Sequence, residues 1–271
     1  MKQQFNLEKE NLKIESTGTL KKTGAPYYVV SLTKSQMSQI LALQNKVIKD
    51  LKQDEEAFIL AKDEAFFTNH LERGNKILGI IADGKLIAQS ILLNPSQKYP
   101  QNGMIDMDAI EQPDKTSVMQ GVIVDPDYRG NKLMDQMVHH WMKFSKQQGK
   151  EHLLAEIEVH NFFSWASFLS QGMNLHSIGV DPADGAVLYN AHEATQNITT
   201  KEQSLSKLFN NAANKDKIKT CRFHDIEGQK KIFAKGYVCV AFNKSAETLT
   251  FVAGKTLKQH QKKALKAAAS V

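Results

Sequence analysis

The stretch Val122-Ile-Val-Asp-Pro-Asp-Tyr-Arg-Gly-Asn-Lys-Leu133 joins an apolar strand, expected over residues 118–124, to a helix with one apolar face. The amino end of a helix carries unpaired N–H groups and a partial positive charge, so it can hold a pyrophosphate. Gly130 lets the backbone approach such a ligand closely, and Arg129 and Lys132 add positive charge. The stretch therefore indicates a phosphate-binding loop, although an ordinary turn before an amphipathic helix has the same pattern.

Upstream of this stretch, the pattern favours a strand at residues 27–32 and a short helix capped by Asp63. Two apolar runs, residues 77–82 and 86–93, are joined through Asp83-Gly84. That dipeptide favours the positive φ angles of a tight hairpin turn. We expect these two runs to pair as antiparallel strands.

Downstream, residues 153–159 form the next expected strand, and residues 162–171 form a short helix that Gly172 ends. The order strand, helix, strand predicts a right-handed crossover between two parallel strands. Residues 94–116 carry three prolines and no clear period, which is typical of a long functional loop.

These motifs resemble the GNAT superfamily of acetyl-CoA-dependent N-acetyltransferases over roughly residues 27–193. In that family a strand ending in Val-x-Pro leads into an Arg-x-x-Gly-x-Gly/Ala loop. In this sequence Val124-Asp-Pro126 matches the Val-x-Pro at the end of the strand. The loop match is partial, since Lys132 occupies the usual glycine position and Met134 the usual small one. A second family motif covers a later strand and the helix after it. The spacing of Glu156 and the residues that follow it matches that motif.

The resemblance implies a mixed, mostly antiparallel sheet with a central parallel strand pair, flanked by helices. It also implies acetyl-CoA as the acetyl donor and the following cofactor-binding residues: Val122, Ile123, Val124, Arg129, Gly130, Asn131, Lys132, Leu133, Met134, Asn161, Ser164 and Phe168.

Direct transfer to an amine needs a base, because a lysine-like ammonium titrates near 10.4. Glu156 matches the base of relatives that acetylate ribosomal protein amino termini, although an exposed strand carboxylate would look the same. Glu158 should share its face, and His160 is a further candidate. The resemblance also implies that the Val124 N–H stabilises the oxyanion.

Phe168 stands where many relatives have a tyrosine that protonates the departing thiolate. A benzyl ring donates no proton, so water, Ser164, Ser167 or Tyr189 would have to replace it. The altered phosphate loop keeps a second interpretation open, in which the chain is a catalytically silent regulatory protein that binds acyl-CoA.

The 271 residues divide by pattern into an extension at 1–26, an N-acetyltransferase domain at 27–195 and a basic appendage at 196–271. Residues 201–271 hold 15 Lys and Arg against 5 Asp and Glu, a balance of +10, whereas the whole chain has +6. We expect strands at 217–223, 231–242 and 248–252 in the appendage, then a basic helix.

The composition argues against a membrane-spanning, secreted or zinc-binding protein. No apolar run is long enough to span a membrane and the start lacks the apolar core of a signal peptide, so a cytoplasmic protein without membrane partners is expected. Cys221 and Cys239 are too few for a zinc cage, and no metal is expected. The expected partner is a small-molecule or protein amine; nucleic acid is not expected, and a homodimer stays open.

Overall fold

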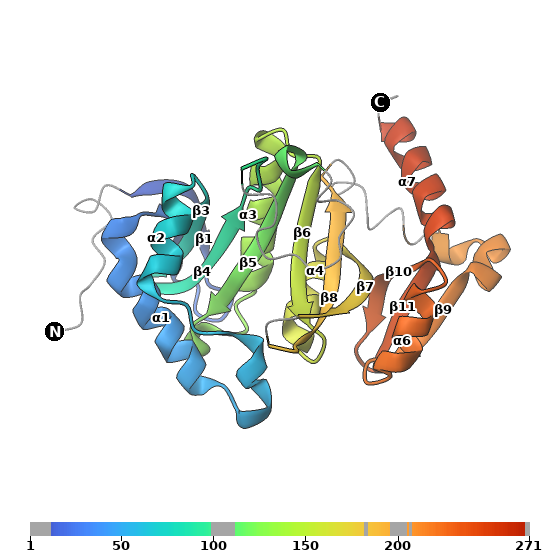
Figure 1. The fold of residues 1–271 in the computed structure, drawn as a ribbon, viewed down its shortest axis with the longest axis horizontal. Coiled ribbons are helices and arrows are strands. Elements are labelled where there is room, and N and C mark those ends of the chain that lie inside the picture. Colours follow the sequence, from blue (N-terminus) through green and yellow to red (C-terminus); the bar gives the residue numbers. More distant parts are fainter. Residues whose placement is uncertain (1–11, 99–111, 182–183, 196–204, 206–207, 269–271) are drawn as a thin grey trace. The chain divides into compact units, whose positions relative to one another are not determined.

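The computed structural model describes residues 12–98, 112–181, 184–195, 205 and 208–268 (Figure 1). The chain divides into two compact units. Unit 1 comprises the described parts of Met1–Asn102 and Ser117–Trp141, and unit 2 comprises those of Gly103–Thr116 and Met142–Val271.

The sheet of unit 1 is antiparallel, with the order β1-β2-β3-β4-β5. Its strands are β1 (Lys13–Thr19), β2 (Pro26–Leu32), β3 (Lys76–Ala82), β4 (Lys85–Leu93) and β5 (Thr116–Val124). β3 and β4 form the expected hairpin, in which Asp83 and Gly84 have φ angles of 50° and 65°. The positive φ angles explain why this dipeptide predicts the turn.

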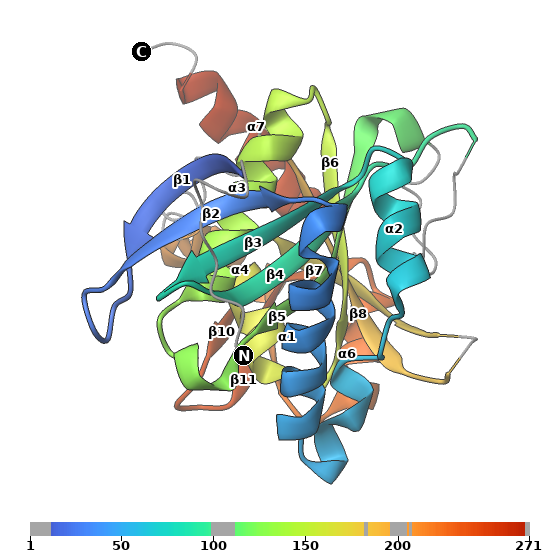
Figure 2. The same cartoon turned by 90° about the vertical axis from the view of Figure 1, so that its left-hand side faces the viewer.

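The helices of unit 1 are α1 (Met37–Asp50), α2 (Glu64–Glu72) and α3 (Leu133–Gln147), the last of which runs on into unit 2. Figure 2 shows α1 and α2 beside the sheet. Asp63 caps α2 as expected, because its carboxylate accepts the Phe66 N–H at 2.8 Å. The Trp141 indole N–H donates to Ser90 Oγ at 2.7 Å, which fastens α3 to β4.

Strand β1 lies within the residues that the sequence assigns to an N-terminal extension. It pairs with β2 along its length, with Thr19 opposite Pro26. The two strands are joined by a turn in which the Gly24 N–H donates to Leu20 O at 2.7 Å. Residues 13–25 therefore form the edge strand of the unit 1 sheet and the turn into β2, which their weak apolar period did not reveal.

The sheet of unit 2 has the order β6-β8-β7-β10-β11-β9, and its registered neighbours are antiparallel. Its strands are β6 (His152–Glu158), β7 (Asn174–Val180), β8 (Val187–Ala194), β9 (Ile218–Arg222), β10 (Tyr237–Asn243) and β11 (Thr248–Ala253). The helices that accompany it are α4 (Phe162–Ser170), α6 (Ile226–Phe233) and α7 (Gly254–Ala268).

The basic segment after residue 196 continues this sheet, because Cys239 of β10 pairs with Leu175 of β7. The strand expected over 231–242 is wrong in its first part, where helix α6 runs to Phe233. Asp225 caps α6 by accepting the Gly228 N–H at 2.8 Å, and Gly236, with a φ of 76°, separates the helix from β10. The sequence does not reveal this helix, because apolar residues continue on both sides of Gly236.

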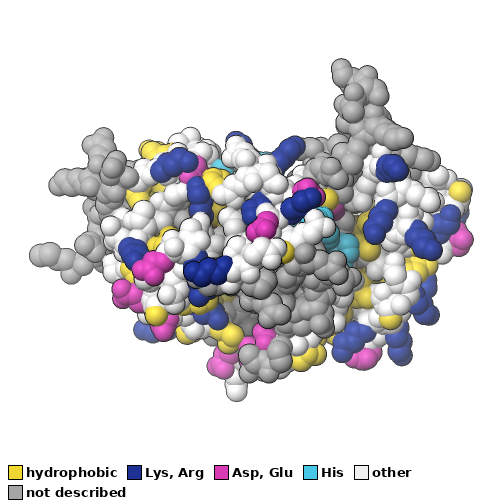
Figure 3. Space-filling view, turned by 45° about the horizontal axis from the view of Figure 1, so that its top comes forward, with side chains coloured by type: hydrophobic (Ala, Val, Ile, Leu, Met, Phe, Trp, Pro, Cys, Tyr) yellow, Lys and Arg dark blue, Asp and Glu magenta, His cyan; other side chains and the backbone are white. Residues whose placement is uncertain are grey.

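Many cations of this segment lie at the surface, as Figure 3 shows for Lys and Arg side chains over the C-terminal strands and helices. The exposed ones are Lys215, Lys217, Arg222, Lys231, Lys235, Lys244, Lys255, Lys258 and Lys262. Within the described part of residues 201–271, the ion pair that forms joins Lys230 to Glu227 at 2.8 Å. This surface therefore carries a strong positive charge.

The fold class expected from the sequence, a mixed α/β fold with a mostly antiparallel sheet flanked by helices, is confirmed. Of the expected loop at 94–116, residues 99–111 lie outside the described residues, and residues 113–115 form a short 3-10 helix. Among the described residues, no helix is both long and apolar enough to cross a membrane.

Candidate active site

The loop between β5 and α3 has the backbone shape of a glycine-rich loop. Gly130 has a φ of 80° and Lys132 a φ of 59°. A non-glycine residue in this left-handed region costs roughly 1–2 kcal/mol, because its Cβ crowds the following carbonyl. Lys132 therefore has a backbone conformation that favours glycine, and its side chain is exposed.

The turn of the β1–β2 hairpin lies against this loop. The Lys22 N–H donates to Asn131 Oδ1 at 2.8 Å, and Asn131 Nδ2 donates to Tyr128 O at 2.9 Å. A Cβ placed on Gly130 would lie 2.8 Å from Lys22 Cε and 2.9 Å from Lys22 Nζ. Asn131 thus braces the loop with its side chain, and the missing Cβ of Gly130 admits a lysine that sequence reasoning did not consider.

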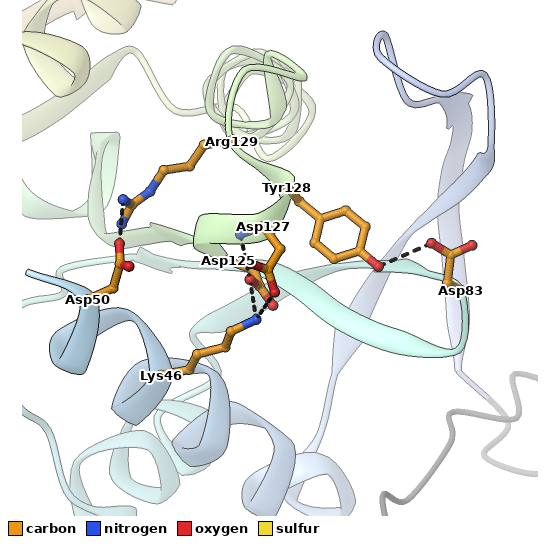
Figure 4. Close-up of polar contacts among 7 residues, drawn as sticks. All are labelled: Lys46, Asp50, Asp83, Asp125, Asp127, Tyr128 and Arg129. Atoms are coloured by element: carbon orange, nitrogen blue, oxygen red, sulfur yellow. Dashed lines mark hydrogen bonds and ion pairs between the residues drawn. The ribbon is translucent and has the colours of Figure 1, made fainter.

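Two groups of ion pairs join the loop to α1 (Figure 4). Lys46 Nζ lies 2.6 Å from Asp125 Oδ1 and 2.6 Å from Asp127 Oδ2. One turn further along α1, Asp50 Oδ2 lies 2.7 Å from the Arg129 guanidinium. The side chains of Arg129 and Asp50 are 48% and 43% exposed, so their pair stabilises the loop by at most about 1 kcal/mol. Arg129 can therefore exchange this partner at low cost.

The other residues of the predicted cofactor site on β5 and α3 are either buried or half-buried. Ile123 and Leu133 are buried, so only their backbone groups can face a ligand. Val122, Val124 and Met134 are half-buried. β5 is also irregular just before them, where its register with β4 shifts and Gly121 has a φ of 58°.

The two predicted carboxylates lie on β6. Glu156 and Glu158 are half-buried and alternate with buried apolar residues, so they share one face of the strand as expected. The Glu158 carboxylate accepts the His160 N–H at 2.6 Å, while burial raises its pKa above the ordinary value. Glu156 pairs in register with Asn190 of β8.

Gly130 and Lys132 thus have positive φ angles just before α3, and Glu156 and Glu158 lie on one face of β6. The sequence model of the acetyltransferase (GNAT) family matches residues 35–173, slightly more than half of the chain. The chain belongs to the GNAT family. It is therefore an acyltransferase, of a family that uses acetyl-CoA and acts on amines.

Solved structures similar to this GNAT acetyltransferase come from several bacteria. The GNAT domain of PAT from S. lividans is 15% identical with a TM-score of 0.49, covering 66% of this chain and 96% of its own. The putative acetyltransferase yncA of Salmonella typhimurium, solved with its cofactor acetyl-CoA, is 16% identical with a TM-score of 0.48, covering 62% and 94%. The ribosomal-protein-S18-alanine N-acetyltransferase of Escherichia coli is 14% identical with a TM-score of 0.46, covering 62% and 94%. Among curated proteins no match was found.

In this GNAT acetyltransferase, three predicted cofactor residues lie on or before α4. Asn161 caps the helix, because its Oδ1 accepts the Ser164 N–H at 3.2 Å. Ser164 is half-buried, and Phe168 is buried. Asn161 therefore has a local structural role, and Phe168 belongs to the core of unit 2.

Tyr189, one of the residues considered as a replacement acid, is fully buried on β8. Its hydroxyl donates to Gln229 Oε1 of α6 at 2.5 Å, and burial raises its pKa well above the ordinary value. Gln229 Nε2 in turn donates to the carbonyls of Arg222 and Phe223, both at 2.9 Å. Tyr189 thus connects the family core to the C-terminal segment, and its proton is held in that contact.

Ser167, another of the residues considered, is half-buried on α4. Among the described residues, no cluster of three or more His, Cys, Asp or Glu side chains could hold a metal ion. The residues that sequence reasoning missed, Lys22, Asn190 and Gln229, come from segments distant in sequence from the motifs they contact. No local pattern marks them.

Proposed function

We propose that this GNAT acetyltransferase transfers the acetyl group of acetyl-CoA to a primary amine of a small molecule or a protein. The observation that carries the proposal is the left-handed backbone at Gly130 and Lys132, directly before the amino end of α3. Positive φ angles at these two positions support a phosphate-binding loop despite the bulky side chain at position 132. The proposed pyrophosphate site is residues 129–134.

The charges near the loop support this placement. Lys132 is exposed, and Lys22 approaches the loop at Gly130. Arg129 would exchange Asp50 for a phosphate, because a surface pair of this kind contributes little. The first-turn amides of α3 would add donors, since the first N–H groups of a helix have no partner within it.

Acetyl-CoA supplies the acetyl group as a thioester, which an amine nitrogen attacks as the carbon–sulfur bond breaks. Glu156 is the proposed base and takes the proton that the acceptor ammonium must lose before its nitrogen can attack. The Val124 N–H is the proposed donor to the oxyanion. With Tyr189 bound to Gln229, the proton for the thiolate would come from water, Ser164 or Ser167.

Glu156→Gln tests the base. The change keeps the shape and removes the proton acceptor, so kcat should fall roughly 10²- to 10⁴-fold on an amine that the wild type acetylates. Turnover is measured as thiol release, and acetyl-CoA affinity by calorimetry should stay the same. Glu151→Gln is the matched control, because Glu151 is an exposed carboxylate next to the same strand that pairs with Lys115.

An unchanged rate and pH profile in Glu156→Gln would contradict the assignment and leave Glu158, His160 or bulk water as the base. Binding of acetyl-CoA without turnover of any amine by the wild type would instead favour the regulatory interpretation.

A further inference from the structure

A row of polar side chains crosses three strands of unit 2. Glu156 on β6 lies directly opposite Asn190 on β8, and Asn190 lies opposite Ser177 on β7. Residues paired directly across an antiparallel sheet project on the same face, with Cβ atoms about 4.5–5.5 Å apart. Asn190 Nδ2 donates to Ser177 Oγ at 2.9 Å, which confirms that these two share a face.

This face is the one that α4 and α6 do not cover. Tyr189, the neighbour of Asn190 in sequence, projects the other way, where it contacts Trp165 of α4 and Gln229 of α6. His192, two residues from Asn190, approaches His152 of β6 at 3.1 Å. Because residues two apart on a strand share a face, the histidine contact and the polar row lie on the same side.

Asn190 is only 1% exposed, and its Oδ1 has no hydrogen-bond partner. Leaving a buried acceptor unsatisfied typically costs about 1–3 kcal/mol. Gln89 Oε1 and Ser145 Oγ are also unsatisfied among the described residues, but neither lies opposite a candidate base. The position of the Asn190 carbonyl therefore points to a donor that the described residues do not supply.

The hydrogen-bonding groups of this polar row limit which kind of donor can bind to the Asn190 carbonyl. The Asn190 carbonyl only accepts hydrogen bonds, because its amide N–H already faces Ser177. An ionised Glu156 across the strand also only accepts. A primary ammonium group, with three N–H donors and a positive charge, suits two such acceptors on neighbouring strands. Burial and the nearby His176 and His152 lower the pKa of His192 to about 3, so His192 adds no repelling charge at neutral pH.

We propose that Asn190 binds the acceptor amine, its Oδ1 accepting an N–H of the amine that Glu156 deprotonates. The assignment rests on the proposed function and adds a residue that selects and orients the acceptor. No proton moves to Asn190. The residue holds the nitrogen so that another of its N–H protons faces the Glu156 carboxylate.

Asn190→Leu tests the proposal, because it removes the acceptor at similar size. The KM for the amine should rise about ten- to a hundredfold, as expected for a buried hydrogen bond to a charged group, with the KM for acetyl-CoA unchanged. Asn190→Asp keeps an acceptor oxygen and should not raise the KM for the amine. Ser170→Ala is the control, since Ser170 is exposed on α4, outside the polar row, and the change should alter the KM for the amine less than threefold.

A second measurement does not depend on turnover. The side-chain ¹³Cγ resonance of Asn190 is followed by NMR while n-butylammonium or a lysine-containing peptide is added in the presence of coenzyme A. We expect it to shift with saturation, including in the Glu156→Gln variant. Loss of turnover in Glu156→Gln with this shift retained supports both assignments, whereas unchanged turnover contradicts only the base.

Two results would overturn the inference. One is a folded Asn190→Leu protein, verified by circular dichroism, with an unchanged KM for the amine or with equal increases for both substrates. The other is a resonance that does not respond to either probe, which would mean that only a buried water satisfies Oδ1.

Discussion

At the scale of single residues, Lys132 is the clearest departure from the family pattern, and its backbone explains the family's preference. Lys132→Gly should raise the free energy of unfolding by about 0.5–1 kcal/mol, because glycine adopts a φ of 59° without a Cβ clash, less its own entropy cost. Urea unfolding measures the change. Lys132→Ala removes the same charge but keeps the Cβ, so it should bring no such gain. Equal stability of the two variants would show that charge, not backbone, sets the effect.

At the scale of elements, the histidines of β6, β7 and β8 connect strand packing to pH. The folded pKa of His192 is lowered to about 3, by burial first and then by His176, His152 and Lys258, whereas the unfolded value is near 6.5. The unfolded chain therefore binds the extra proton, so the stabilisation is complete above pH 6.5 and is lost as pH falls toward 3. The slope is about 1.4 kcal/mol per pH unit for one proton.

His192→Gln should flatten the acid side of the stability curve, measured by urea unfolding between pH 7 and pH 4. His224→Asn is the control, because His224 is exposed. A slope that is the same in His192→Gln and wild type would mean that other groups dominate, with His70 the first candidate since burial lowers its pKa to about 4.

At the scale of the whole molecule, the C-terminal segment belongs to the sheet of unit 2. Two aromatic rings of α4 contact two rings of this segment. Phe162 and Trp165 lie at centroid distances of 5.0–5.8 Å from Phe223 and Phe242. The Tyr189–Gln229 hydrogen bond joins the same two parts of the chain. The basic appendage is therefore part of the folded core of its unit rather than a tail.

Gln229→Leu should lower the free energy of unfolding by about 1–3 kcal/mol, because it leaves a buried tyrosine hydroxyl without a partner. Adding Tyr189→Phe should recover part of that loss, since the buried hydroxyl is then removed, while the Arg222 and Phe223 carbonyls still lack the Gln229 Nε2 donor. A double-mutant cycle by urea unfolding measures the coupling. Additive losses would show that the two side chains do not interact energetically.

The sequence by itself determined the local features, namely the hairpin at Asp83-Gly84, the turn into α3 and the shared face of Glu156 and Glu158. Each depends on residues only a few positions apart, whose φ preferences and period are visible locally. Only the tertiary structure placed Lys22 on the loop between β5 and α3, and Asn190 opposite Glu156. Strand register and hairpin docking depend on packing between distant segments, which no local pattern encodes.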